Sequence, residues 1–130
     1  MFYSTDIITK TFFVTAGTFG AMAVYGYFTK SDLTSWGKLL IMAVVGLIIA
    51  GIVNIFMKSS TMDLVISGIG VLVFVGLTAY DSQKIKRMLM MQTDTGETAQ
   101  KIALMGSLSL YLDFINLFLY LLRFFGRGNN

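Results

Sequence analysis

Two acidic residues, Asp81 and Asp113, are the side chains of this 130-residue chain with the clearest capacity for chemistry. Asp113 is the single charge between Lys101 and Arg123. It lies well inside that stretch, about 16 Å along a helix from the first apolar residue, which places it near the middle of a bilayer. A carboxylate at that depth is costly and usually faces a cavity, a partner or an ion pathway.

Two carboxylates that lie close together in a medium of low dielectric constant do not both ionise easily. Such a pair can hold a proton, hold a hard cation, or alternate between the two. The chain has no His and no Cys, so a metal held by Asp81 and Asp113 would need further oxygen ligands, which favours Ca²⁺ over Zn²⁺ or Cu. The alternatives are structural: Asp113 as a protonated acid bonded to a neighbouring helix, and Asp81 as a helix-end acid paired with Lys84.

The composition indicates a membrane protein. Hydrophobic residues make up 55% of the chain, charged residues make up 13%, and the mean hydropathy is +0.74. Soluble domains carry about 25% charged residues, so the composition argues against a water-soluble fold. Disordered chains are polar and charged, so disorder is excluded. The net charge of +3 lies between the apolar stretches, which is typical of membrane topology rather than of nucleic-acid binding.

Four apolar stretches divide the chain, at residues 11–29, 39–57, 64–80 and 102–122. Each approaches the roughly 20 residues that a helix needs to cross a bilayer, and none alternates as barrel strands do. The sequence predicts an all-α integral membrane protein with a single membrane domain over residues 1–130. We place its four transmembrane helices at about 8–29, 37–57, 62–91 and 97–124. The cluster Thr93 to Gly96 is expected to break the chain between the last two.

The distribution of Lys and Arg predicts the orientation. One side of the predicted bundle collects Lys30, Lys38, Lys84, Lys86, Arg87 and Lys101, and the other collects Lys10, Lys58, Arg123 and Arg127. Cytoplasmic loops carry the excess of basic residues, so the loop over residues 82–101 is expected in the cytoplasm.

A one-sided polar seam follows the fourth predicted helix: Gly106, Ser109, Asp113, Asn116, Tyr120 and Arg123. Gaps of three and four residues place all six on one face. Small and hydroxyl residues at such positions usually serve helix packing, which is also the simplest interpretation of Thr11 and Thr15 on the first helix. Sequential helices pack antiparallel, so Asp81 should approach Asp113, with Tyr80, Ser109, Asn116 and Tyr120 as supporting polar residues.

Two motifs carry a resemblance to a known family. They are Gly76-Leu77-Thr78-Ala79-Tyr80-Asp81-Ser82-Gln83-Lys84-Ile85 and Leu110-Tyr111-Leu112-Asp113-Phe114-Ile115-Asn116-Leu117-Phe118. Residues 15–20 and 27–33 add to the similarity, which covers nearly the whole chain. The chain resembles the Bax inhibitor family of membrane proteins, in its bacterial branch.

The resemblance implies a seven-helix bundle of which this chain supplies the last four helices, with three expected N-terminal helices absent from it. It also implies a bacterial inner-membrane protein that acts as a pH-sensitive calcium-leak channel. Asp81 and Asp113 match the family's proton-sensing aspartate pair, and Ca²⁺ is then the transported ion rather than a resident cofactor. The family's basic residue that latches one of these acids has no counterpart in this chain.

Two other functions were weighed. An intramembrane aspartyl protease also uses two aspartates on adjacent helices, but its Gly-x-Gly-Asp motif is missing at Asp113 and the chain has no Pro for its third motif. We therefore expect no enzyme activity. A non-conducting regulator that binds a membrane partner, such as a membrane-bound protease, stays open as the alternative. Lipid is the expected environment, and nucleic acid is not an expected partner.

Overall fold

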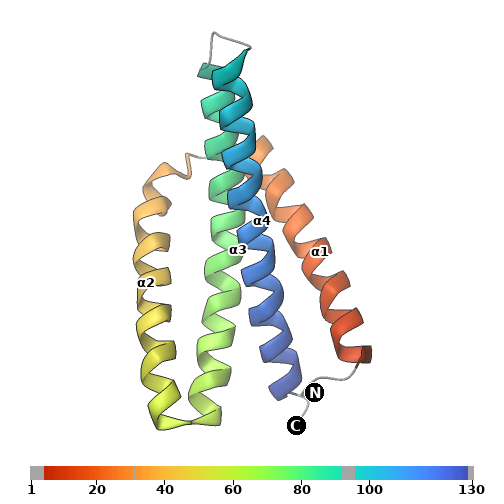
Figure 1. Cartoon of the computed structure of the whole chain (residues 1–130), viewed down its shortest axis with the longest axis vertical. Helices are drawn as coiled ribbons and strands as arrows, with labels where there is room; N and C mark the ends of the chain where they lie inside the picture. The colour runs from red at the N-terminus through yellow and green to blue at the C-terminus, as the bar shows by residue number, and fades with distance from the viewer. Residues whose placement is uncertain (1–4, 31, 92–95, 129–130) are drawn as a thin grey trace.

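The computed structural model describes residues 5–30, 32–91 and 96–128, and these residues form four helices with no strand among them. The helices are α1 (Thr5–Phe28), α2 (Thr34–Met57), α3 (Ser60–Met91) and α4 (Glu97–Gly128). They run up, down, up and down, so the start of α1 and the end of α4 lie at the same end of the bundle (Figure 1). The predicted all-α class is confirmed.

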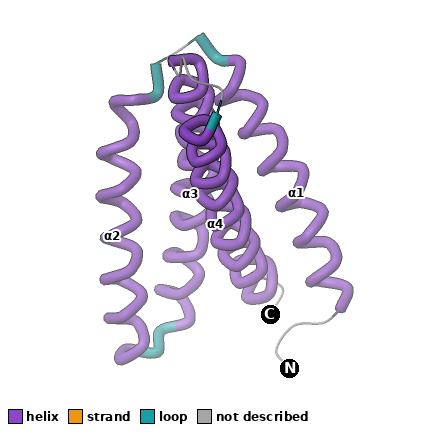
Figure 2. Tube along the Cα trace, turned by 45° about the horizontal axis from the view of Figure 1, so that its top comes forward, coloured by secondary structure: helices purple, strands orange, loops and turns teal. Residues whose placement is uncertain are grey.

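All four helices are long and apolar enough to cross a membrane. Large apolar side chains such as Ile41, Met42 and Phe56 are exposed on α2, which suits a lipid environment and not water. The 32 residues of α3 span about 48 Å, longer than the roughly 30 Å hydrocarbon core. α3 and α4 pack against each other, and at one end they reach past α1 and α2 (Figure 1). In Figure 2, α1 and α2 lie on opposite sides of this pair.

The observed helix bounds differ from the predicted ones at several ends. α1 begins at Thr5, so Asp6 lies in its first turn, and α2 begins at Thr34, so Thr34 and Ser35 lie in its first turn. α2 ends where Lys58 adopts a left-handed conformation, with φ of 54°. α4 continues to Gly128, past the charge at Arg123 where the apolar run stops. The predicted break at Thr93 to Gly96 lies mostly outside the described residues.

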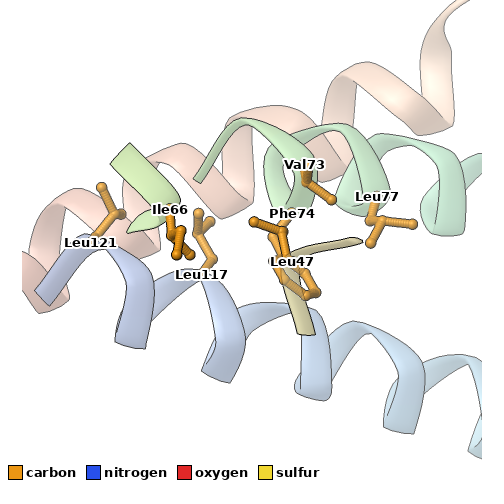
Figure 3. Packing of buried hydrophobic residues seen from close by; sticks show 7 residues of the cluster. All are labelled: Leu47, Ile66, Val73, Phe74, Leu77, Leu117 and Leu121. Atoms are coloured by element: carbon orange, nitrogen blue, oxygen red, sulfur yellow. The ribbon is translucent and has the colours of Figure 1, made fainter. Parts of the chain in front are cut away.

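α3 is the central helix, because it packs against each of the other three. α1 also packs against α4, and α2 packs against α3 alone among the described elements. Seven apolar side chains form the core between them (Figure 3): Leu47, Ile66, Val73, Phe74, Leu77, Leu117 and Leu121. This core fixes the faces that α3 and α4 present to each other, and so positions the polar residues between them.

Two glycines allow close approach of the outer helices to α3. A Cβ atom at Gly26 of α1 would overlap the backbone of Ala79, and one at Gly37 of α2 would lie 2.5 Å from the Tyr80 ring. Small residues at such crossings are the usual means of packing helices in lipid. Ser82 adds a bond from its hydroxyl to the carbonyl oxygen of Ala23, at 2.6 Å.

Candidate functional site

The register between α3 and α4 is set by close contacts at both ends of the apolar core. Gly106 faces Ile85, so closely that a Cβ atom at Gly106 would lie 2.7 Å from that side chain. Further along α4, the Tyr120 ring stacks on Phe74 with centroids 5.6 Å apart. The two helices are antiparallel, so the segment between these contacts brings Asp113 of α4 opposite Asp81 of α3.

The side chains of Asp81 and Asp113 lie close enough to interact directly across the α3–α4 interface. Asp113 is only 6% exposed, whereas Asp81 is half-buried. The Oδ2 atom of Asp113 is buried and has no hydrogen-bond partner among the described residues. A proton on one carboxyl is therefore the donor that can join the two acids, since an ionised carboxylate only accepts. The structure brings together the two acids that the sequence singled out.

A small cavity of about 90 Å³ lies beside the pair, between α3 and α4. Asp81, Lys84 and Ser109 line it together with apolar side chains and Gly106. Lys84 is exposed, so this cavity faces the end of the bundle from which the 82–101 segment extends. The half-buried acid of the pair is thus the one nearer to water, and Asp113 is the deeper one.

The pair alone does not make a resident metal centre. Among the residues that the structure describes, no third His, Cys, Asp or Glu joins the two acids. Ca²⁺ takes six to eight oxygen ligands, so two carboxylates and the hydroxyl of Ser109 would leave much of its shell to water. The arrangement fits a proton or a partly hydrated cation in transit.

The four polar residues predicted to support the acid pair do not all lie beside it. Ser109 lines the small cavity, while Asn116 and Tyr120 are half-buried on the α3-facing side of α4. Tyr80 lies apart from the acids and packs against Gly37 of α2. Successive residues of a helix are rotated by about 100°, so the immediate neighbour of Asp81 points toward a different helix.

Asp63 is a further buried acid, at the opposite end of the bundle from Asp81 and Asp113, and it was not predicted from the sequence. Asp63 is 6% exposed, and its Oδ1 atom lies 3.5 Å from Nη2 of Arg123. Both residues line a cavity of about 410 Å³, together with Asn54 and Lys58 from the end of α2. A first-turn acid usually remains in solvent. Here Arg123 reaches across the α3–α4 contact and gives the buried Asp63 a charged partner.

The segment between α1 and α2 is tied to α3 by Gln83 and Arg87. The backbone N–H of Leu33 donates to Oε1 of Gln83 at 2.8 Å, and Nη1 of Arg87 donates to Asp32 at 2.9 Å. The hydroxyl and backbone N–H of Thr34, followed by the Arg87 guanidinium, lower the pKa of Asp32 from its ordinary value to about 2. Asp32 is therefore ionised at all physiological pH values and does not sense pH.

The fold and the site define a polytopic helical membrane protein with an acid pair between its two longest helices. The family described as inhibitor of apoptosis-promoting Bax1 matches the chain over residues 1–130. The chain belongs to this family, the Bax inhibitor family, as the two aspartate motifs predicted.

Relatives at high identity come from several bacteria. A protein of Borreliella burgdorferi is 53% identical over 130 residues, which cover 100% of this chain and 56% of that protein. The inner membrane protein YbhL of Escherichia coli is 53% identical over 126 residues, which cover 95% of this chain and 53% of that protein. A membrane protein of Streptococcus pyogenes is 42% identical over 127 residues, which cover 98% of this chain and 55% of that protein.

The chain therefore spans about half the length of the curated relatives it matches. These relatives and the four apolar helices identify it as an integral membrane protein.

Proposed function

We propose that this chain forms the acid-sensing part of a pH-sensitive cation leak, with Ca²⁺ as the transported ion and the bacterial inner membrane as its location. The observation that carries the proposal is the pairing of one acid from α3 with one from α4 inside the helix interface. The 82–101 segment, with its basic residues, lies on the cytoplasmic side in this proposal.

The physical basis is the charge of the pair. With one proton shared, the two carboxyl groups bridge α3 and α4 by a hydrogen bond. With that proton lost, two negative charges about 4 Å apart repel by about 4 kcal/mol at an effective dielectric constant of about 20. The ionised pair also attracts cations from the small cavity beside it. Protonation therefore changes both the spacing of the two helices and the affinity for a cation.

A liposome assay tests this proposal. The purified chain is reconstituted with an internal Ca²⁺ indicator, and influx is measured between about pH 6 and about pH 8. Asp81→Asn and Asp113→Asn should each flatten the pH dependence of influx. The matched control is Asp6→Asn, because Asp6 is an exposed acid of α1 paired with Lys10 at 3.1 Å. Unchanged profiles in both pair variants would refute the proposed sensor.

The second candidate is a non-conducting regulator that binds a membrane partner. The exposed face of α4 favours it, because Leu104, Met105, Leu108 and Tyr111 present a large apolar surface. In this case the folded, inserted chain conducts no Ca²⁺ at any pH but copurifies with a defined membrane protein, such as a membrane-bound protease. Loss of that partner on substitution of Leu108 by Lys, with the fold intact, would favour this second function.

A further inference from the structure

The cavity of about 410 Å³ beside Asp63, which we name the Asp63 cavity, takes its lining from α2, α3 and α4. Among the described residues α2 and α4 do not pack against each other, so the cavity lies between them and over α3. Figure 1 shows the turn between α2 and α3 at the same end of the bundle as the end of α4. The apolar stretch 39–57 stops at this level and Lys58 begins the polar turn, so the cavity lies where lipid headgroups meet the hydrocarbon core.

The charged side chains of the Asp63 cavity carry an excess of positive charge. Two basic residues, Lys58 and Arg123, line it together with a single acid, Asp63. Asp63 pairs with Arg123, whereas Lys58 forms no ion pair with an acid among the described residues. Two like charges in one cavity repel each other unless counter-charges balance them, so the lining is complementary to a ligand with one further negative charge.

The same lining offers hydrogen-bond donors of the kinds that bind phosphate. The Arg123 guanidinium has five N–H donors and its side chain is 49% exposed, so the contact with Asp63 leaves donors available. The Ser59 hydroxyl accepts a bond from a backbone N–H in the first turn of α3 at 3.1 Å, which leaves its own proton to donate. Ser60 adds a second hydroxyl group, and Lys58 adds the donors of its ammonium group. Guanidinium and ammonium groups form their strongest hydrogen bonds with phosphate and carboxylate oxygens.

The rest of the lining is apolar and continues along α2 toward the membrane interior. Gly51 precedes Lys58 by about two helical turns, or about 10 Å, and Ile55 and Ile66 complete this part of the cavity. A Cβ atom at Gly51 would meet nothing within 4 Å, so there is open space beside α2 at this point. A free phosphate ion makes no use of an apolar extension, whereas a phospholipid has an acyl chain to place in it.

We infer that the Asp63 cavity binds a membrane phospholipid with an anionic headgroup, with the phosphate against Lys58 and Arg123 and an acyl chain extending toward Gly51. Basic pockets between membrane helices are a recurrent type of site for anionic headgroups. An anionic headgroup is favoured over a zwitterionic one, because the cationic group of the latter adds positive charge where the lining already has an excess. Asp63 holds the Arg123 guanidinium at the rim of the cavity. This binding is independent of the proposed leak.

Lipid titration of the purified chain in detergent micelles tests the charged part of the site. Bound lipid is counted by native mass spectrometry, and the unfolding temperature gives a second readout, because a ligand of the folded state stabilises it. Dioleoylphosphatidylglycerol should bind and raise the unfolding temperature, and dioleoylphosphatidylcholine should bind severalfold more weakly. Lys58→Gln should weaken phosphatidylglycerol binding by about tenfold. The matched control is Lys10→Gln, which removes an exposed positive charge from α1, outside the cavity, and should leave binding unchanged. Equal weakening by the two Lys variants would indicate non-specific attraction and overturn the site.

Substitution of Gly51 separates a lipid from a free phosphate. Gly51→Leu should fill the apolar part of the cavity and weaken phosphatidylglycerol binding severalfold. Gly46→Leu is the matched control, because an added Cβ atom at either position meets nothing within 4 Å and Gly46 does not line the cavity. Inorganic phosphate or glycerol phosphate should not reproduce the stabilisation. Stabilisation by either soluble phosphate as large as that by the lipid, with no effect of Gly51→Leu, overturns the lipid assignment.

Discussion

The contact of Gly26 with Ala79 should make this glycine far less replaceable than the other glycines of α1. A Cβ atom at Gly26 would lie 2.7 Å from the backbone carbonyl carbon of Ala79 and 2.8 Å from its Cα atom. Ordinary carbon contacts are about 3.5 to 4 Å, so α1 must move away from α3 by about 1 Å. Backbone atoms cannot rotate away as a flexible side chain can, and the movement also strains the 2.6 Å bond from Ser82 to Ala23.

We expect Gly26→Ala to lower the free energy of unfolding by about 1 to 3 kcal/mol, the usual range for overpacking. Gly17→Ala and Gly20→Ala on the same helix are the matched controls, because an added Cβ atom would meet nothing within 4 Å at either position. Reversible denaturation in mixed micelles, followed by helix content, measures all three variants. A Gly26→Ala variant as stable as the two controls would refute the α1–α3 crossing described above.

Two further predictions concern the segment between α1 and α2 and the stacked rings between α3 and α4. The pKa of Asp32 is lowered to about 2, so its contribution to stability is fully present above its unfolded pKa of about 3.9 and is lost only as the pH falls toward about 2. Asp32→Asn should therefore leave the midpoint of the flux profile unchanged; a displaced midpoint would show that this loop takes part in sensing. Tyr120 stacks on Phe74, so Tyr120→Leu should reduce stability by about 1 kcal/mol while Tyr120→Phe keeps most of it, measured by the same denaturation. Equal losses in the two Tyr120 variants would mean that the hydroxyl group, not the stacked ring, matters.

The architecture could be predicted from the sequence because it depends on local quantities. The length of each apolar stretch and the charges at its ends specify four membrane-spanning helices, and the periodic seam identifies the face of α4 that meets α3. The approach of Asp81 to Asp113 follows from antiparallel packing of sequential helices. None of these steps requires the detailed shape of a side chain.

Other parts of the site depend on contacts between distant residues and could not be predicted. The burial of Asp63 depends on Arg123, which reaches it from the end of another helix at 3.5 Å. The Thr11 and Thr15 stripe looked like ordinary packing, and its complete burial follows only from the way α1 lies across both α3 and α4. Tyr80 was grouped with Asp81 because they are adjacent in sequence, whereas helical geometry turns it toward α2.

The most direct test of the central claim is a pH jump on vesicles that contain the chain, with Ca²⁺ influx recorded before and after the jump in one preparation. We predict that the wild-type chain changes its influx rate within the same vesicles, and that the Asp81→Asn/Asp113→Asn double variant, inserted and folded to the same extent, does not. An identical change of rate in the double variant would contradict the assignment of Asp81 and Asp113 as the pH sensor.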